Sequence, residues 1–336
     1  MHPPMKLGAL FGALAVAALV AWMLTTDAAW QVLDLIGNAG WPGLTAVVLF
    51  HISQLLFSGA GWRALAYFGS PRPRLGLFVT ARWIREAVNN LLPVAQVGGE
   101  FVGARLLHQR GVKLNVAVAS TVSDLTVEFV TQLAFTLIGL FLLLLTAGYG
   151  PVARAVTIVL IVAIAIAAAF AAAQGVGLAH LVEAAMMRLG RTFGWTGFTE
   201  VAGLHETLIA IYRARPRLMR ASAHHLFSWL LGGVEVYLAL HVLGHPVELS
   251  SALVIESVGQ TFKAFGFAVP GALGIQEGGY ILVCGLYGLS PELAVALSLV
   301  KRLREIALGL PALATWQWLE ARKPTKPPLP CPGIVP

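Results

Sequence analysis

Six stretches of the chain are apolar for long enough to cross a lipid bilayer as helices. A transmembrane helix needs about 20 apolar residues, because each residue advances the helix by only about 1.5 Å. The first stretch has no convincing signal-peptide cleavage site, and Asp27 follows it, so we expect a retained helix. The stretches cover residues 7–24, 42–66, 114–146, 152–173, 222–243 and 291–319. This pattern predicts an all-α polytopic membrane protein with about six transmembrane helices.

Two further apolar stretches, residues 77–107 and 250–287, contain polar residues and a centre rich in proline and glycine. Broken backbone at membrane depth is tolerated only where protein or a water-filled cavity surrounds it. We therefore predict two re-entrant helical hairpins, each with non-helical backbone at its tip. The predicted tip and gate residues are Pro93, Gly98, Gly99, Glu100, Pro270, Gly271, Gly274, Gln276 and Glu277. The alternatives are a pair of full spans in each stretch, and glutamates that only cap the helices they begin.

Lysine and arginine residues predict the orientation of these helices. They are concentrated in residues 63–85, 105–113 and 174–220 and in the C-terminal tail, whereas the intervening links, including the loop 25–41, have none. Cytoplasmic loops of membrane proteins carry an excess of Lys and Arg. Six spans with both termini cytoplasmic would place every basic segment inside, so we expect a multi-pass protein of the bacterial inner membrane.

The remaining segments complete the predicted organisation. Residues 1–323 form a single transmembrane domain, and residues 324–336 form a disordered Pro-rich tail. Within loop 174–220, apolar residues recur at helical spacing, as at Leu204, Leu208 and Ile211, so we expect amphipathic helices at the cytoplasmic interface.

Composition narrows the functional classes. Apolar residues make up 57% of the 336 residues and charged residues only 12%, which excludes an ordinary soluble domain. The net charge of +7 fits loops beside anionic lipid and does not require a nucleic-acid partner. Two cysteines are too few for a disulfide or metal argument, and the histidines show no metal-ligand spacing. We expect no metal and no cofactor, and we interpret His224 and His225 as polar residues at an interface.

An internal repeat is indicated by a shift of 177 residues along the chain. The shift aligns Pro93 with Pro270, Glu100 with Glu277, and Glu128 with Glu305. These residue types are rare in membrane segments, so their matches carry weight. The two predicted units, 42–146 and 222–319, are separated by an odd number of crossings and would have inverted topology. Inverted repeats with broken helices are typical of secondary transporters.

Charged residues lie near the expected midplane of two spans. Such residues are expensive in a bilayer and normally face a cavity or the bundle interior. Because three cations exceed what the neighbouring acids must neutralise, we predict a cavity for a lipid headgroup, with the acids facing the cations across the repeat interface. The predicted cavity residues are Asp124, Glu128, Lys301, Arg302, Arg304 and Glu305. The alternative is a charge network that only holds the two repeats together.

The sequence resembles a known family in two blocks. The first is NNLLPVAQVGGEFVGARLL with SDLTVEFVTQ, and the second is VPGALGIQEGGYILVCGLYGLSPELAVALSLVKRLREIALGLP. Both are similar to the lysylphosphatidylglycerol synthase transmembrane-region family, and their residues are most similar to those of its hopanoid-associated branch. The resemblance covers about residues 40–320. It implies an inner-membrane protein of lipid metabolism; in multi-domain relatives the equivalent region is a flippase. Only 17 residues follow Leu319, so no aminoacyl-transferase domain is expected here.

Three functions remain open at this stage. The first is a lipid transporter or flippase for a hopanoid, an anionic phospholipid or another amphipathic lipid. The second is a membrane-embedded enzyme, although the chain has no Asp-x-Asp pair and no Gly-rich phosphate loop, so we expect no catalytic residues. The third is an accessory subunit of lipid-biosynthesis enzymes. We expect the first.

Overall fold

Every element that the structure describes is an α-helix, as the apolar pattern predicts. The computed structural model describes residues 27–66, 74–92, 98–151, 153–158, 160–162, 164–165, 203–265 and 274–322. The helices are α2 (Asp27–Leu65), α3 (Leu75–Leu91), α4 (Gly98–Gln109), α5 (Leu114–Ala147), α8 (Leu204–Arg213), α9 (Arg215–Val242), α10 (Leu249–Phe265), α11 (Ile275–Leu286) and α12 (Pro291–Ala321). The predicted span 7–24, half of span 152–173 and the tail 324–336 lie outside the described residues.

Three of these helices are long and apolar enough to cross a membrane. The qualifying segments are Trp30–Leu65, Leu114–Ala147 and Arg215–Val242, which lie in α2, α5 and α9. Helix α12 has 31 residues and is also long enough, but its cluster of Lys, Arg and Glu lowers its hydropathy. The protein is therefore an all-α polytopic membrane protein.

The prediction that residues 25–41 form a loop is wrong for the described part of that segment. Helix α2 begins at Asp27 and continues through a kink at Gly40, whose φ of 63° is left-handed. Val32 is buried, and Leu35 and Ile36 are partly buried against the same core, so this segment has an apolar face that packs against the protein. Apolar residues at i, i+3 and i+4 favour a helix over a loop.

The described end of loop 174–220 agrees with the predicted amphipathic helix. Leu204 and Ile211 of α8 are buried, and Leu208 packs partly buried against the same cluster. Helix α8 lies against α5, and the Tyr212 hydroxyl lies 3.2 Å from the Thr126 hydroxyl of α5. The next helix, α9, already begins at Arg215.

Each predicted hairpin is a pair of short helices packed together. Helices α3 and α10 have 17 residues each, and helices α4 and α11 have 12 each. Twelve residues rise about 18 Å, which is well short of the roughly 30 Å hydrocarbon core. The lengths therefore favour re-entrant hairpins over pairs of full spans.

The backbone at the hairpin tips agrees with the prediction at Gly274 and differs at Gly99. Gly274 precedes α11 with a φ of 80°, whereas Gly99 lies inside the first turn of α4. A Cβ at Gly99 would stand 2.3 Å from the backbone oxygen of Arg85. Gly99 is therefore needed for the close approach of α4 to α3, and not for a break in the helix. Pro93, Pro270 and Gly271 lie outside the described residues.

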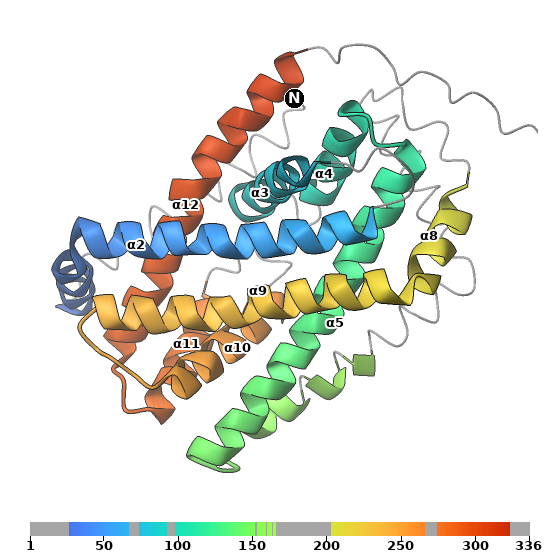
Figure 1. Cartoon of the computed structure of the whole chain (residues 1–336). Coiled ribbons are helices and arrows are strands. Elements are labelled where there is room, and N and C mark those ends of the chain that lie inside the picture. The colour runs from blue at the N-terminus through green and yellow to red at the C-terminus, as the bar shows by residue number, and fades with distance from the viewer. Residues whose placement is uncertain are drawn as a thin grey trace, which may run out of the picture.

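The packing of the helices has the symmetry expected of a duplication. The order long helix, hairpin, long helix occurs as α2, α3–α4, α5 and again as α9, α10–α11, α12. Helix α3 of the first unit packs on α12 of the second, and α10 of the second packs on α5 of the first. Helices α2 and α9 lie side by side and run in opposite directions (Figure 1). Below, helices α2, α3, α4 and α5 are called unit 1, and helices α9, α10, α11 and α12 are called unit 2.

The two hairpins have separate apolar cores. Trp62 and Phe78 are fully buried around the first hairpin, and Tyr280 and Cys284 around the second. The outer faces remain apolar, with Phe141 61% exposed on α5. Such a surface fits contact with lipid, because a bilayer provides no water to solvate polar groups there.

Candidate functional site

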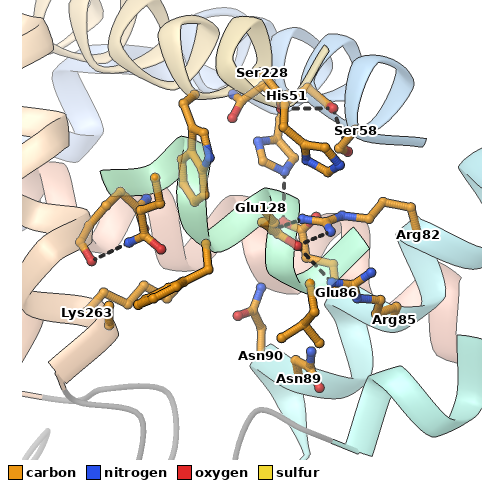
Figure 2. A pocket seen from close by; sticks show the side chains of 18 of the residues that line it. His51, Ser58, Arg82, Arg85, Glu86, Asn89, Asn90, Glu128, Ser228 and Lys263 are labelled. Carbon is orange, nitrogen blue, oxygen red and sulfur yellow. Dashed lines mark hydrogen bonds and ion pairs between the residues drawn. The ribbon is translucent and has the colours of Figure 1, made fainter. Parts of the chain in front are cut away.

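A polar cavity of about 300 Å³ lies where the two units meet, and we call it the central cavity. Its walls come from α2, α3, α4, α5, α9, α10 and α12, so both hairpins contribute. Figure 2 shows labelled lining residues from several of these helices. The residues that line it are His51, Gln54, Ser58, Arg82, Arg85, Glu86, Asn89, Asn90, Glu100, Leu125, Glu128, Phe129, Gln132, His225, Ser228, Trp229, Glu256, Gln260, Lys263, Ala264 and Arg304.

Arg85 of α3 is the centre of the ionic cluster of unit 1. Its Nη1 lies 2.5 Å from Asp124 Oδ2 and its Nη2 lies 2.7 Å from Glu128 Oε2. Its Nε lies 2.6 Å from Glu100 Oε2, so this one guanidinium contacts three carboxylates. Both terminal nitrogens of Arg82 donate hydrogen bonds to the carboxylate of Glu128, as Figure 2 shows. The planar fork of arginine suits such paired contacts with carboxylates.

Lys301 of α12, the residue equivalent to Asp124, is the main cation of the corresponding cluster in unit 2. Its Nζ lies 2.5 Å from Glu256 Oε2 of α10, and both side chains are 3% exposed. The Tyr280 hydroxyl donates to the same carboxylate oxygen at 3.1 Å. Lys263 of α10 in turn lies 2.7 Å from Glu305 Oε1. In each unit, two charged residues of the last long helix therefore pair with charges on the hairpin of the same unit: Asp124 and Glu128 in unit 1, Lys301 and Glu305 in unit 2.

A third cluster links the two units. Arg304 of α12 donates to Glu235 Oε1 of α9, which is 1% exposed. His51 of α2 lies beside both, with Nδ1 2.9 Å from Glu235 Oε2 and 3.0 Å from Arg304 Nη1. The other ring nitrogen of His51 lies 3.1 Å from Glu86 Oε1 of α3. On the opposite side of the interface, His225 Nε2 of α9 lies 2.8 Å from Asp124 Oδ1.

The predicted pairing of Asp124 and Glu128 with the basic residues of α12 is wrong. Both acids are held by Arg82 and Arg85 of their own unit, and Lys301 is held by Glu256 of its own unit. The first residues of α3 and α10 are 174 positions apart, and so are Arg82 and Glu256. The ion pair of Arg82 with Asp124, 3.8 Å apart in unit 1, therefore corresponds to the pair of Glu256 with Lys301 in unit 2, with the signs reversed.

The expectation that cations exceed acids near the midplane is also wrong. Within the described residues, six Lys and Arg side chains and eight carboxylates take part in the ion pairs around the central cavity. The cations are Arg82, Arg85, Lys263, Lys301, Arg302 and Arg304, and the acids are Glu86, Glu100, Asp124, Glu128, Glu235, Glu256, Glu277 and Glu305. An anionic headgroup therefore meets no surplus of positive charge.

The predicted cavity residues divide into lining and supporting positions. Glu100, Glu128 and Arg304 line the central cavity. Asp124 and Lys301 are 0% and 2% exposed and stand behind that lining. Glu305 borders a smaller cavity beside it. The other described residues from the prediction are not part of the lining: Arg302, Gln276, Glu277, Gly98, Gly99 and Gly274.

The two hairpin glutamates differ in their contacts. The Gly274 amide donates to Glu277 Oε2 at 2.7 Å, so Glu277 caps α11, as the capping alternative predicts. Glu277 also lies 3.3 Å from Arg302 Nη2. Glu100 contacts Arg85 instead, and the Gly99 amide donates to Asn89 Oδ1 at 2.8 Å. Only Glu100 reaches the cavity.

Sequence reasoning missed several site residues. They are His51 of α2, His225 and Glu235 of α9, and the hairpin residues Arg82, Arg85, Glu86, Glu256 and Lys263. His225 is 2% exposed and bonded to Asp124, so the interpretation of this residue as interfacial is wrong. Glu235 could have been found from the sequence, because an isolated acid in an apolar helix marks a functional candidate. Within the described ranges, no three His, Cys, Asp or Glu side chains are grouped as metal ligands.

Comparison with known proteins identifies a family for nearly the whole chain. A family model described as lysylphosphatidylglycerol synthase TM region matches residues 9–312. No curated protein and no solved structure matches the chain significantly.

Proposed function

Because the chain belongs to the lysylphosphatidylglycerol synthase transmembrane-region family, we propose that this membrane protein of lipid handling is a lipid transporter. It moves the headgroup of an amphipathic lipid between leaflets while the apolar tail stays in the bilayer. The observation that carries the proposal is the central cavity, a polar space of about 300 Å³ bounded by both units. Polar cavities between inverted repeats are where transporters bind their substrates.

The cavity chemistry favours a hydroxylated headgroup over an anionic one. The cations that line it, such as Arg82 and Arg304, are already paired with carboxylates. Neutral hydrogen-bonding groups are available beside them, and the Trp229 indole N–H has no hydrogen-bond partner in the described chain. Hydroxyl groups can both donate to carboxylates and accept from amide and indole N–H groups. A hopanoid bearing hydroxyl groups is a lipid of this kind, and the proposed setting is the inner membrane with cytoplasmic termini.

Purified protein in liposomes tests this function with two labelled lipids. We expect a neutral glucosyl diacylglycerol to cross at least about tenfold faster than phosphatidic acid, a difference of roughly 1.4 kcal/mol. The recovered lipid should be chemically unchanged by mass spectrometry, because the protein is proposed not to be an enzyme. Failure to move either lipid would overturn the proposal. A covalently altered lipid would show that the protein is an enzyme and would also overturn it.

Filling the cavity should block this movement. Ser228 lines the cavity, so Ser228→Phe is expected to slow lipid crossing by about tenfold. Ala223→Phe, on the exposed side of the same helix, is the matched control and should leave the rate unchanged. Thermal unfolding of both variants verifies that they fold. Equal rates for the two folded variants would place the lipid path elsewhere.

A further inference from the structure

His51 and His225 are equivalent residues of the two units. They lie 174 positions apart, as do the first residues of α3 and α10, Leu75 and Leu249. Both histidines line the central cavity, and they are only 6% and 2% exposed. Each one contacts a charged residue on the last long helix of the other unit: His51 contacts Arg304, and His225 contacts Asp124. The duplication has thus placed a buried histidine on both sides of the same interface.

The surroundings of His51 can satisfy both of its protonation states. When the ring is neutral, Nε2–H donates to Glu86 and the bare Nδ1 accepts from Arg304 Nη1 at 3.0 Å. When the ring is protonated, Nδ1–H donates to Glu235 Oε2 at 2.9 Å and Nε2–H still donates to Glu86. Arg304 then keeps its contact with Glu235 Oε1. Histidine is the side chain whose charge changes in the physiological pH range.

The charged groups around His51 are supplied by every helix that faces it. Glu86 comes from α3, Glu235 from α9, and Arg304, with Glu305 3.6 Å from it, from α12. On the side of α3, Arg82 also acts on Glu86. The exposed fraction of the side chain falls from 27% at Glu86 to 8% at His51 and 1% at Glu235. Glu86 is therefore the member of this line that is most open to the cavity.

The groups around His225 form the corresponding set. Asp124 of α5 bonds to its Nε2, and Glu128 of the same helix lies within electrostatic range. Arg82 and Arg85 of α3 hold both acids. On α9 itself the flanking groups are His224 and Arg220. The carboxylate of Asp124 can accept from either the neutral ring or its protonated form.

With all eight carboxylates ionised, the charge balance of the network has room for two protons. Eight carboxylates face six Lys and Arg side chains in the described ion pairs, which leaves two negative charges uncompensated. Unpaired charge in a membrane interior is costly. Protonation of His51 and His225 would neutralise the excess. It would also strengthen the attraction between units, because His51 would then donate to Glu86 of unit 1 and Glu235 of unit 2 together.

From this arrangement we infer that His51 and His225 are proton-binding sites that couple proton movement to lipid transport. The inference rests on the proposed function. The energy source for that function would be a proton gradient across the membrane. Proton release at His51 returns Nδ1 to Arg304 and ends the histidine bridge between Glu86 and Glu235. Uptake restores the bridge, so the proton controls how firmly the two units are held together.

The experiment imposes a pH difference across liposomes that contain the full chain and labelled glucosyl diacylglycerol. One coupled proton supports an accumulation of the lipid in one leaflet of up to about tenfold per pH unit, and two coupled protons up to about a hundredfold. We expect accumulation for the wild type and for His241→Gln, an exposed control at the end of α9. His51→Gln and His225→Gln should each lose accumulation, and either variant serves if the other does not fold.

A second measurement separates the proton sites from transport itself. In wild-type protein in nanodiscs, nitrogen NMR should show the His51 ring changing between singly and doubly protonated forms within about pH 5–8. A His51 ring that does not titrate would overturn the inference even if lipid moves. Lipid movement that ignores the pH difference would overturn the coupling and leave the proposed function intact. Absence of any lipid movement would instead refute the proposed function, with the titration still deciding whether His51 takes up a proton.

Discussion

Arg85→Leu is expected to prevent the protein from folding or to lower its stability by about 3–5 kcal/mol, because it removes one partner from a buried ionic cluster. Arg85 is 4% exposed on its side chain and contacts Glu100, Asp124 and Glu128. Its loss leaves three carboxylates facing Arg82 alone on α3. Arg85→Lys should recover only part of the stability, since an ammonium group cannot reproduce the arginine fork. The measurement is thermal unfolding of the detergent-purified variants.

Arg105→Leu is the matched control for this experiment. Arg105 also pairs with a glutamate, Glu320, but their side chains are 28% and 30% exposed. Because water reaches this half-buried pair, its contribution should be close to the roughly 1 kcal/mol upper range of surface pairs and well below that of the buried cluster. If Arg85→Leu unfolds at the same temperature as Arg105→Leu, the ionic cluster of unit 1 is not the buried network that the structure shows.

The second large effect concerns Lys301 and its partner in unit 2. Lys301→Met alone leaves Glu256 buried without its cation, and we expect a loss of about 3–5 kcal/mol. Adding Glu256→Gln removes the stranded charge while keeping a group that can hydrogen-bond to the Tyr280 hydroxyl, so the double variant should recover most of the stability. Unfolding temperatures of the single and double variants measure this recovery.

A different double variant tests which acid is the partner. Combining Lys301→Met with Asp124→Asn should give no recovery, because Asp124 pairs with Arg85 and His225 in the structure. The second change would instead damage the cluster of unit 1. Recovery in this double variant, and not with Glu256→Gln, would show that the charges pair across the repeat interface.

Much of the fold could be predicted because rare residues mark its irregular points. Proline and glutamate matches at a constant shift indicated two units, and the short helices of each hairpin follow from the polar and glycine-rich centres. The segment 27–40 was interpreted as a loop because it lies between the predicted spans 7–24 and 42–66 and contains Asp27 and Asp34. Tertiary burial of Val32 favours a helix there despite Gly40.

The ion pairs could not be predicted, because a repeat relates equivalent positions and does not say which residues touch. Asp124 and Lys301 are equivalent and opposite in charge, which suggested a mutual contact. In the structure each meets a hairpin residue of opposite sign in its own unit, Arg85 and Glu256. The burial of His51 and His225 could not be predicted, because a histidine in the sequence gives no information about its burial.

Lipid transport through the central cavity requires that a lipid headgroup enters it, and photo-crosslinking measures this. The photoreactive amino acid p-benzoylphenylalanine would replace Phe129, which lines the cavity, or Phe141, which is 61% exposed on the same helix. After irradiation in liposomes containing glucosyl diacylglycerol, mass spectrometry identifies the part of the lipid attached. We predict headgroup adducts at position 129 and acyl-chain adducts at position 141. If no headgroup adduct forms at position 129 in folded protein that still moves the lipid, the headgroup does not enter the central cavity.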